Sequence, residues 1–162
     1  MPLLIYLSNK TPSIIGHDIS QKIINDLKKG KIGFFEKNLK TLLKQNLKRG
    51  KIFFNSNFKK IKAQNYIICV GSEIKNKKII NNNFFNICKK IGSKLNQGDL
   101  VILRGTIQVG LSQKLLIPTL EKASGLKCGK DFSYSFMPER IVEGDALFEL
   151  KTLPQLISGK TD

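Results

Sequence analysis

Histidine and cysteine are scarce in this sequence, which has one histidine and three cysteines in 162 residues. The cysteines, Cys69, Cys88 and Cys128, are odd in number and far apart, and no CxxC pair occurs. Zinc sites and disulfide frameworks need clustered or paired ligands. The sequence therefore predicts neither of them, and we expect no metal ion. We expect Cys69 and Cys88 in the core and Cys128 in a loop, with none of the three acting as a nucleophile.

Long apolar runs are also missing. No stretch reaches the roughly 18 apolar residues that a membrane-spanning helix needs. The apolar residues 3–7 have no basic segment before them and no small-residue cleavage site after them, which argues against a signal peptide. We therefore expect a cytoplasmic protein with no membrane partner. A hydrophobic content of 41% in a chain of this length predicts one globular domain with a real core.

Arginine is rare although the net charge is +16, because arginine occurs only at positions 49, 104 and 140 among 28 basic residues. Nucleic-acid-binding modules favour arginine, whose planar guanidinium forms paired hydrogen bonds. The lysines are spread along the chain, and no aromatic cluster accompanies them. We therefore interpret the charge as a solvated basic surface and expect no nucleic-acid partner. A basic module that binds nucleic acid or another anion stays open as an alternative.

Short apolar runs alternate with helical periodicity along the chain. The runs predict strands at residues 13–17, 51–54, 66–70, 100–103 and 132–136. The periodicity predicts helices at residues 21–29, 36–49, 83–95 and 112–122, the last irregular at Pro118, and residues 75–82 resemble a loop. Apolar strands separated by helices indicate an α/β fold with a parallel sheet covered on both faces.

Ligands of such sheets bind at the carboxyl ends of the strands, so the residues that follow the strands are the candidates for a site. Asp18 follows the first predicted strand. In dinucleotide-binding units an acid at this position accepts hydrogen bonds from ribose hydroxyls, about 20 residues after a glycine-rich loop. No GxGxxG occurs here, and counting back places such a loop just before Met1, with residues 2–10 as the helix that follows it. A role for Asp18 as a helix cap or turn residue stays open.

A second group of candidates lies in residues 137–144, MPERIVEG, which we call the acidic loop. Glu139 and Glu143 are four residues apart and flank Arg140. A carboxylate whose properties are tuned by its neighbours suits acid/base chemistry. A solvated turn with a local ion pair is the alternative interpretation of the same residues.

Residues 98–110, GDLVILRGTIQVG, and residues 124–159, which contain PERIVEG and LKTLPQ, resemble the N-terminal half of the UDP-glucose/GDP-mannose dehydrogenases. These nucleotide-sugar 6-dehydrogenases have an R/K-S-T-x-x-x-G turn after a strand and later a P-E-x-x-x-E-G loop. Residues 14–31, 34–54 and 66–72 agree in order, so the resemblance covers nearly all of the chain. It implies a Rossmann-like, doubly wound, mostly parallel sheet that lacks its first strand and glycine-rich loop.

The resemblance implies that the cofactor is NAD. Asp18 is similar to the family's ribose-binding acid, and Lys22 lies one position from the basic residue expected after it. Gly71 and Ser72 stand where the family has a G-T-P turn after the strand. Thr106 and Glu143 complete the set of expected cofactor-binding residues, on the nicotinamide side.

The same family oxidises the C6 alcohol of a nucleotide sugar twice, through a cysteine thioester, and so supplies polysaccharide or lipopolysaccharide precursors. The resemblance makes Thr106 the hydroxyl residue near the nicotinamide and the reacting carbon. Glu139 is similar to the carboxylate that helps to activate water, and Glu143 to the acid that closes over the nicotinamide. We expect these three residues to be catalytic, with a UDP-sugar as substrate. The form P-E-R, with Arg140, favours a UDP-N-acetylhexosamine over UDP-glucose.

The sequence also departs from the family pattern. The usual E-P-G-L segment is EKNL at residues 36–39, and Gly105 replaces the common serine before Thr106. None of the three cysteines stands at the nucleophile position, which belongs to a later domain. We therefore expect residues 1–162 to be a partial NAD-binding domain without the central helix and C-terminal domain, inactive alone and homo-oligomeric only when full length. A non-catalytic remnant or a split-enzyme partner is the alternative.

Overall fold

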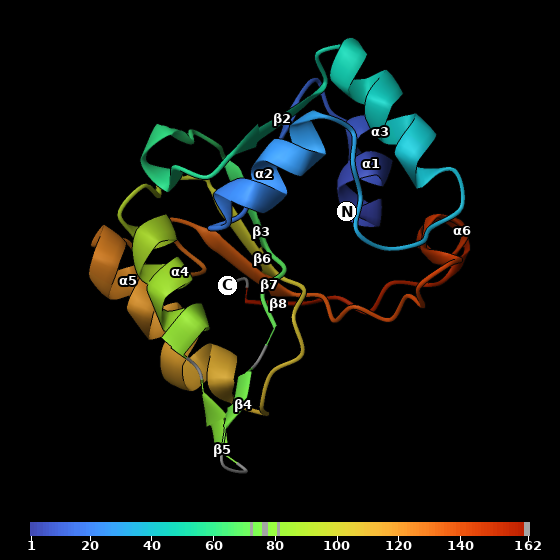
Figure 1. The fold of residues 1–162 in the computed structure, drawn as a ribbon. Helices are drawn as coiled ribbons and strands as arrows, with labels where there is room; N and C mark the ends of the chain where they lie inside the picture. Colours follow the sequence, from blue (N-terminus) through green and yellow to red (C-terminus); the bar gives the residue numbers. More distant parts are fainter. Residues whose placement is uncertain (72, 76–77, 81, 161–162) are drawn as a thin grey trace. The chain divides into compact units, whose positions relative to one another are not determined.

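The structure is a computed structural model that describes residues 1–71, 73–75, 78–80 and 82–160, with the backbone alone for residues 73–75, 78–80 and 160. Helices and strands are interspersed along the chain (Figure 1). The chain divides into two compact units. Unit 1 comprises residues 1–61 and 140–154, and unit 2 comprises residues 62–139 and 155 onward. In the part of the chain that the structure describes, no helix is both long and apolar enough to cross a bilayer.

Unit 1 contains a two-stranded parallel sheet in which Ile14 lies opposite Ile52 and His17 opposite Asn55. Its elements are α1 (Pro2–Ser8), β1 (Ile14–His17), α2 (Gln21–Lys28), α3 (Leu39–Lys48), β2 (Ile52–Asn55), the short 3-10 helix η1 (Phe58–Lys60) and α6 (Ala146–Thr152). Helix α1 contacts β1, α3 and α6, and α2 contacts β2. The helices and strands share one apolar core, made of Ile5, Ile24, Leu27, Leu39, Leu43, Ile52 and Phe54.

The predicted start and cap of α2 are confirmed, whereas the predicted start of α3 is three residues too early. Ser20 caps α2, because its Oγ accepts a hydrogen bond from the Ile23 N–H at 3.3 Å. Gly30 follows that helix with a φ of 68°, a conformation that glycine adopts without steric cost. Helix α3 begins at Leu39 and not at residue 36, because Asn38 has a φ of 63° and is not helical.

Unit 2 contains a four-stranded sheet in the order β3-β6-β7-β8. Strands β3 (Asn65–Ile68), β6 (Leu100–Leu103) and β7 (Ser133–Phe136) are parallel, and β8 (Ser158–Lys160) is antiparallel to β7. Ile68 lies beside Leu103, and Leu103 beside Phe136, so the three parallel strands end level with one another. Helices α4 (Asn82–Gly92) and α5 (Ile117–Ser124) contact each other and contribute to the core of this unit.

A π-helix, η2 (Ser112–Leu116), precedes α5. Pro118 has no backbone N–H, and in an α-helix its ring would clash with the carbonyl four residues earlier. A wider turn before the proline avoids that clash. The irregularity that the sequence predicts at Pro118 is therefore confirmed.

Several expectations are wrong. Residues 75–82 were expected to form a loop, but β4 (Glu73–Lys75) pairs antiparallel with β5 (Lys78–Ile80) and α4 begins at Asn82. Consecutive β-branched residues in β5 favour a strand over a loop. Cys69, expected in the core, is exposed because it lies past the end of β3. Cys88 is buried as expected, and Cys128 lies in a loop but is also buried.

The parallel strands form two sheets and not one. In the Rossmann order 3-2-1-4-5-6, the second strand joins the fourth only through the first. Among the described residues, no strand precedes β1. If β1, β2 and β3 are the second, third and fourth strands of that order, the division into two sheets is what a Rossmann-like chain without its first strand should show.

Candidate functional site

The three parallel strands of unit 2 end side by side, and candidate residues follow each of them. Gly71 comes after β3, Thr106 after β6 and Glu139 after β7. Gly71 and Thr106 are exposed to solvent. The structure thus brings these three candidates to one edge of one sheet, where parallel α/β sheets bind ligands. Ser72 lies outside the described residues.

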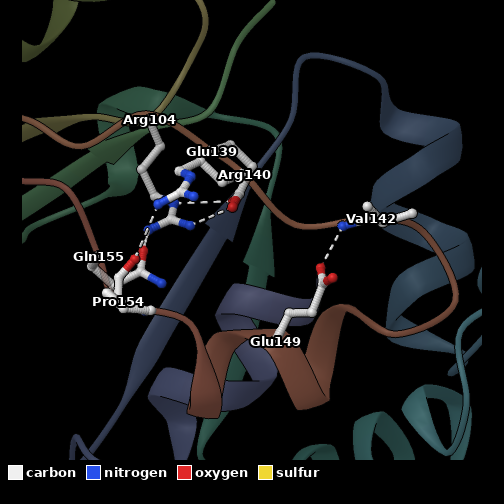
Figure 2. A network of polar contacts seen from close by, with 7 residues as sticks. All are labelled: Arg104, Glu139, Arg140, Val142, Glu149, Pro154 and Gln155. Atoms are coloured by element: carbon white, nitrogen blue, oxygen red, sulfur yellow. Dashed lines mark hydrogen bonds and ion pairs between the residues drawn. The ribbon is translucent and has the colours of Figure 1, made fainter.

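Glu139 is held at this edge by a two-pronged ion pair with Arg104, shown in Figure 2. Nη2 of Arg104 lies 2.5 Å from Oε1 of Glu139, and Nε donates to Oε2 at 3.1 Å. The backbone N–H of Glu139 also donates to the carbonyl of Arg104 at 3.3 Å. The Arg104 side chain is 2% exposed, whereas that of Glu139 is 34% exposed. The buried guanidinium of Arg104 therefore fixes the carboxylate of Glu139, which is still partly exposed to solvent.

Glu139 of the acidic loop pairs with Arg104, which lies outside that loop. Arg140 donates to the carbonyl of Pro154 at 3.4 Å (Figure 2). Sequence reasoning did not find Arg104 as the partner of Glu139, because the two are 35 residues apart. A signal was nevertheless present: an arginine that directly follows a buried strand needs a counter-charge.

Two thiols of unit 2, those of Cys69 and Cys88, have raised pKa values. Desolvation raises the pKa of the Cys69 thiol, although the residue as a whole is exposed. Burial raises the pKa of Cys88 to about 12. The thiolate is the reactive form of cysteine, so a raised pKa lowers reactivity at neutral pH. That neither residue is a nucleophile stays a prediction.

Asp18 follows β1 in unit 1, at the carboxyl end of a parallel strand. Its Oδ1 accepts a hydrogen bond from the backbone N–H of Ser20 at 2.8 Å, so the turn role left open by the sequence is observed. The second carboxylate oxygen, Oδ2, is also a hydrogen-bond acceptor. Lys22 lies in the first turn of α2 and is exposed. His17 Nδ1 donates to the carbonyl of Asn55 at 2.8 Å and ties the end of β1 to β2.

Glu143 is exposed, and the residues around it are anchored within unit 1. On one side, the Val142 N–H donates to Oε2 of Glu149 at 2.6 Å (Figure 2). On the other side, the 8% exposed Glu36 accepts hydrogen bonds from the backbone N–H groups of Gly144, Ala146 and Leu147 at 3.0, 3.3 and 3.1 Å. Sequence reasoning identified Glu36 only as the first residue of the altered E-P-G-L segment.

The residues present fit NAD in part. Asp18 places a carboxylate at the carboxyl end of β1, and Thr106 places a hydroxyl at the carboxyl end of β6, the strand ends where such sheets bind ligands. The glycine-rich loop that would bind the pyrophosphate does not occur in residues 1–162. In the described ranges, no group of three or more histidine, cysteine or acidic side chains could hold a metal ion.

Comparison with known proteins agrees with this geometry. Residues 1–162 match the UDP-glucose/GDP-mannose dehydrogenase family, NAD binding domain. The chain belongs to this family. Its fold is the Rossmann-like NAD-binding fold, and NAD is the cofactor of that domain.

Relatives include UDP-N-acetyl-D-glucosamine 6-dehydrogenase of Salmonella typhi, which is 30% identical over 154 residues, or 94% of this chain and 35% of the relative. Protein CapL of Staphylococcus aureus is 29% identical over 99% of this chain and 37% of its own length. The solved UDP-D-ManNAc dehydrogenase of Pyrococcus horikoshii has a TM-score of 0.94 and 25% identity, covering 99% of this chain and 38% of its own. The chain thus spans little more than a third of the length of these proteins.

Proposed function

We propose that this chain is the NAD-binding part of an NAD-dependent nucleotide-sugar 6-dehydrogenase, which oxidises the C6 alcohol of a UDP-sugar to the uronic acid. The observation that supports this most directly is the placement of Thr106 and Glu139 after adjacent strands, in a chain that matches the family over its whole length. Such products are precursors of polysaccharides or lipopolysaccharides. The enzyme would be homo-oligomeric when full length.

Each candidate residue has a task in this proposal. NAD⁺, when bound, accepts a hydride from C6. Asp18 accepts hydrogen bonds from the adenosine ribose, assisted by Lys22, Gly71 and Ser72 as further cofactor contacts. Thr106 offers its hydroxyl beside the nicotinamide and C6. These groups bind and orient the reactants, and orientation lowers the barrier because the entropy is lost before the chemical step.

The carboxylates of the acidic loop act later in the reaction. Glu139 accepts a hydrogen bond from the water that hydrolyses the thioester, and Glu143 covers the nicotinamide side. The thiolate that forms the thioester comes from a cysteine outside residues 1–162. We therefore propose that residues 1–162 are a partial domain and have no dehydrogenase activity alone.

For the substrate, we propose a UDP-N-acetylhexosamine over UDP-glucose. Arg140 supports this choice, since the P-E-R form resembles the members that act on acetamido sugars. Arg140 lies on the exposed acidic loop, with its guanidinium tied to the carbonyl of Pro154. The main chain therefore orients the Arg140 side chain.

The test is to express the longest reading frame that contains residues 1–162 and to measure NADH formation with UDP-N-acetylhexosamines, UDP-glucose and GDP-mannose. The 162-residue chain is the matched control. We expect NADH from the longer protein, fastest with a UDP-N-acetylhexosamine, and none from the chain alone. An inactive longer protein would contradict the proposed activity, and a clear preference for UDP-glucose would contradict the proposed substrate. Tight DNA binding that weakens steeply with salt would favour the nucleic-acid alternative.

A further inference from the structure

We propose that Arg104 is a positioning residue: it holds the carboxylate of Glu139 in the orientation that the reaction uses. This inference rests on the proposed function. Arg104 occupies the first position after β6 and Glu139 the third after β7, so the pair joins the ends of two adjacent strands. A third contact, from Nη1 of Arg104 to Oε1 of Gln155 at 3.4 Å, holds the guanidinium from the other side (Figure 2).

The burial of the two side chains separates their roles. Arg104 is 2% exposed and cannot meet a substrate directly, whereas the Glu139 side chain, at 34%, can. Arg104 therefore acts through Glu139. Replacing a buried ion pair with apolar residues is often neutral or stabilising, so a buried pair is weak grounds for a role in stability alone.

The geometry of the contact indicates what Arg104 contributes. Nε and Nη2 each donate to a different oxygen of the carboxylate, which fixes the plane of the carboxylate as well as its position. Lysine could supply the positive charge but not the two parallel hydrogen bonds of a planar guanidinium. Positioned groups lose much of their effect when they shift by about 1 Å, and such shifts cost roughly 10²-fold in rate.

The test compares R104K, R104Q, E139Q and the double variant R104Q/E139Q. The control is R49K, a change at the exposed Arg49 that follows α3. Urea unfolding is measured on the 162-residue chain, and kcat and KM on the longer enzyme. We expect R104Q and E139Q each to raise the unfolding equilibrium constant about 10²-fold or more, because each leaves a charge or its partner unsatisfied. In the double variant, the unfolding equilibrium constant should rise by less than the product of the two single-variant increases.

The decisive variant is R104K, which keeps the buried charge. We expect it to recover much of the stability lost in R104Q, yet to lower kcat roughly 10- to 100-fold with the KM for NAD⁺ nearly unchanged. If Arg104 had a purely structural role, the kcat of R104K would recover together with its stability. Normal kcat in R104K, with an active wild type, would overturn the positioning role and leave the proposed function standing. An inactive wild-type enzyme would contradict both the positioning role and the proposed function.

Discussion

The carboxylate of Glu36 accepts a hydrogen bond from the backbone N–H of Gly144, 108 residues later in the sequence, at 3.0 Å. The same carboxylate binds two further N–H groups at the start of α6, so one buried side chain anchors the end of the acidic loop. Gly144 has a φ of 103°, which favours glycine. The exposed Glu143 is therefore followed directly by a residue, Gly144, whose backbone is held in place by Glu36.

Substituting Glu36 should release this anchor. We expect Glu36→Gln to lower the free energy of unfolding by about 1–3 kcal/mol, because hydrogen bonds to a charged acceptor are lost from a buried site. The backbone amides of Gly144, Ala146 and Leu147 should exchange with deuterium faster. Glu149→Gln is the matched control, since the hydrogen bond from the Val142 N–H to Oε2 of Glu149 is exposed. Equal protection of the three amides in Glu36→Gln and wild type would contradict the anchor.

Alkaline pH should destabilise the protein through Tyr134. Burial raises the pKa of Tyr134 from 10.0 to about 12. Between those values the unfolded chain releases the proton while the folded chain keeps it, so stability is complete below about pH 10 and falls as the pH rises toward 12. Burial raises the pKa of Cys88 from 9.0 to about 12. This adds a further loss of stability with rising pH, which begins near pH 9.

Urea unfolding at several pH values measures this effect. Tyr134→Phe should show a smaller loss of stability above pH 10. At neutral pH it should cost about 1 kcal/mol, because the Ser112 hydroxyl loses its 2.9 Å hydrogen bond to Tyr134. A Tyr134→Phe profile that falls as steeply as wild type would show that another group controls alkaline unfolding.

The three cysteines should differ in their reaction with a thiol reagent. Cys69 is exposed, whereas Cys88 and Cys128 are 0% and 6% exposed. We expect one thiol to react in the folded protein and the other two only on unfolding. Cys69 should still react more slowly than a free cysteine at neutral pH, because desolvation raises its pKa. Loss of the early-reacting thiol in Cys69→Ser identifies it, and an early reaction that persists in this variant would contradict the burial of the others.

Gly92 should not tolerate a side chain. A Cβ at this position would lie 2.6 Å from the Cβ of Ala123 and 3.0 Å from the carbonyl oxygen of Leu120, where α4 meets α5. We expect Gly92→Ala to destabilise the chain by about 1–2 kcal/mol, because overpacking outweighs the higher helix propensity of alanine. Adding Ala123→Gly should recover part of the loss. A Gly92→Ala variant as stable as wild type would show that the two helices can move apart.

Local signals in the sequence predicted much of the fold. The β6 strand was placed at its observed bounds, and the cap at Ser20 and the break at Pro118 followed from the chemistry of single residues. Thr106 and Glu139 follow β6 and β7, as the predicted strand ends indicated. Pairs of distant residues could not be read in this way. Glu36 with Gly144, and Arg104 with Glu139, depend on how the chain folds back on itself.

We propose that Asp18 serves cofactor binding and that Glu139 serves the reaction. Asp18→Ala and Glu139→Gln are compared in the longer enzyme, with NAD⁺ affinity, KM and kcat measured for both. Loss of a contact made equally in the ground and transition states raises KM alone, so Asp18→Ala should raise the KM for NAD⁺ with little change in kcat. Glu139→Gln should lower kcat by about 10² or more and leave NAD⁺ affinity nearly normal. An Asp18→Ala enzyme that lost kcat while binding NAD⁺ normally would contradict the account.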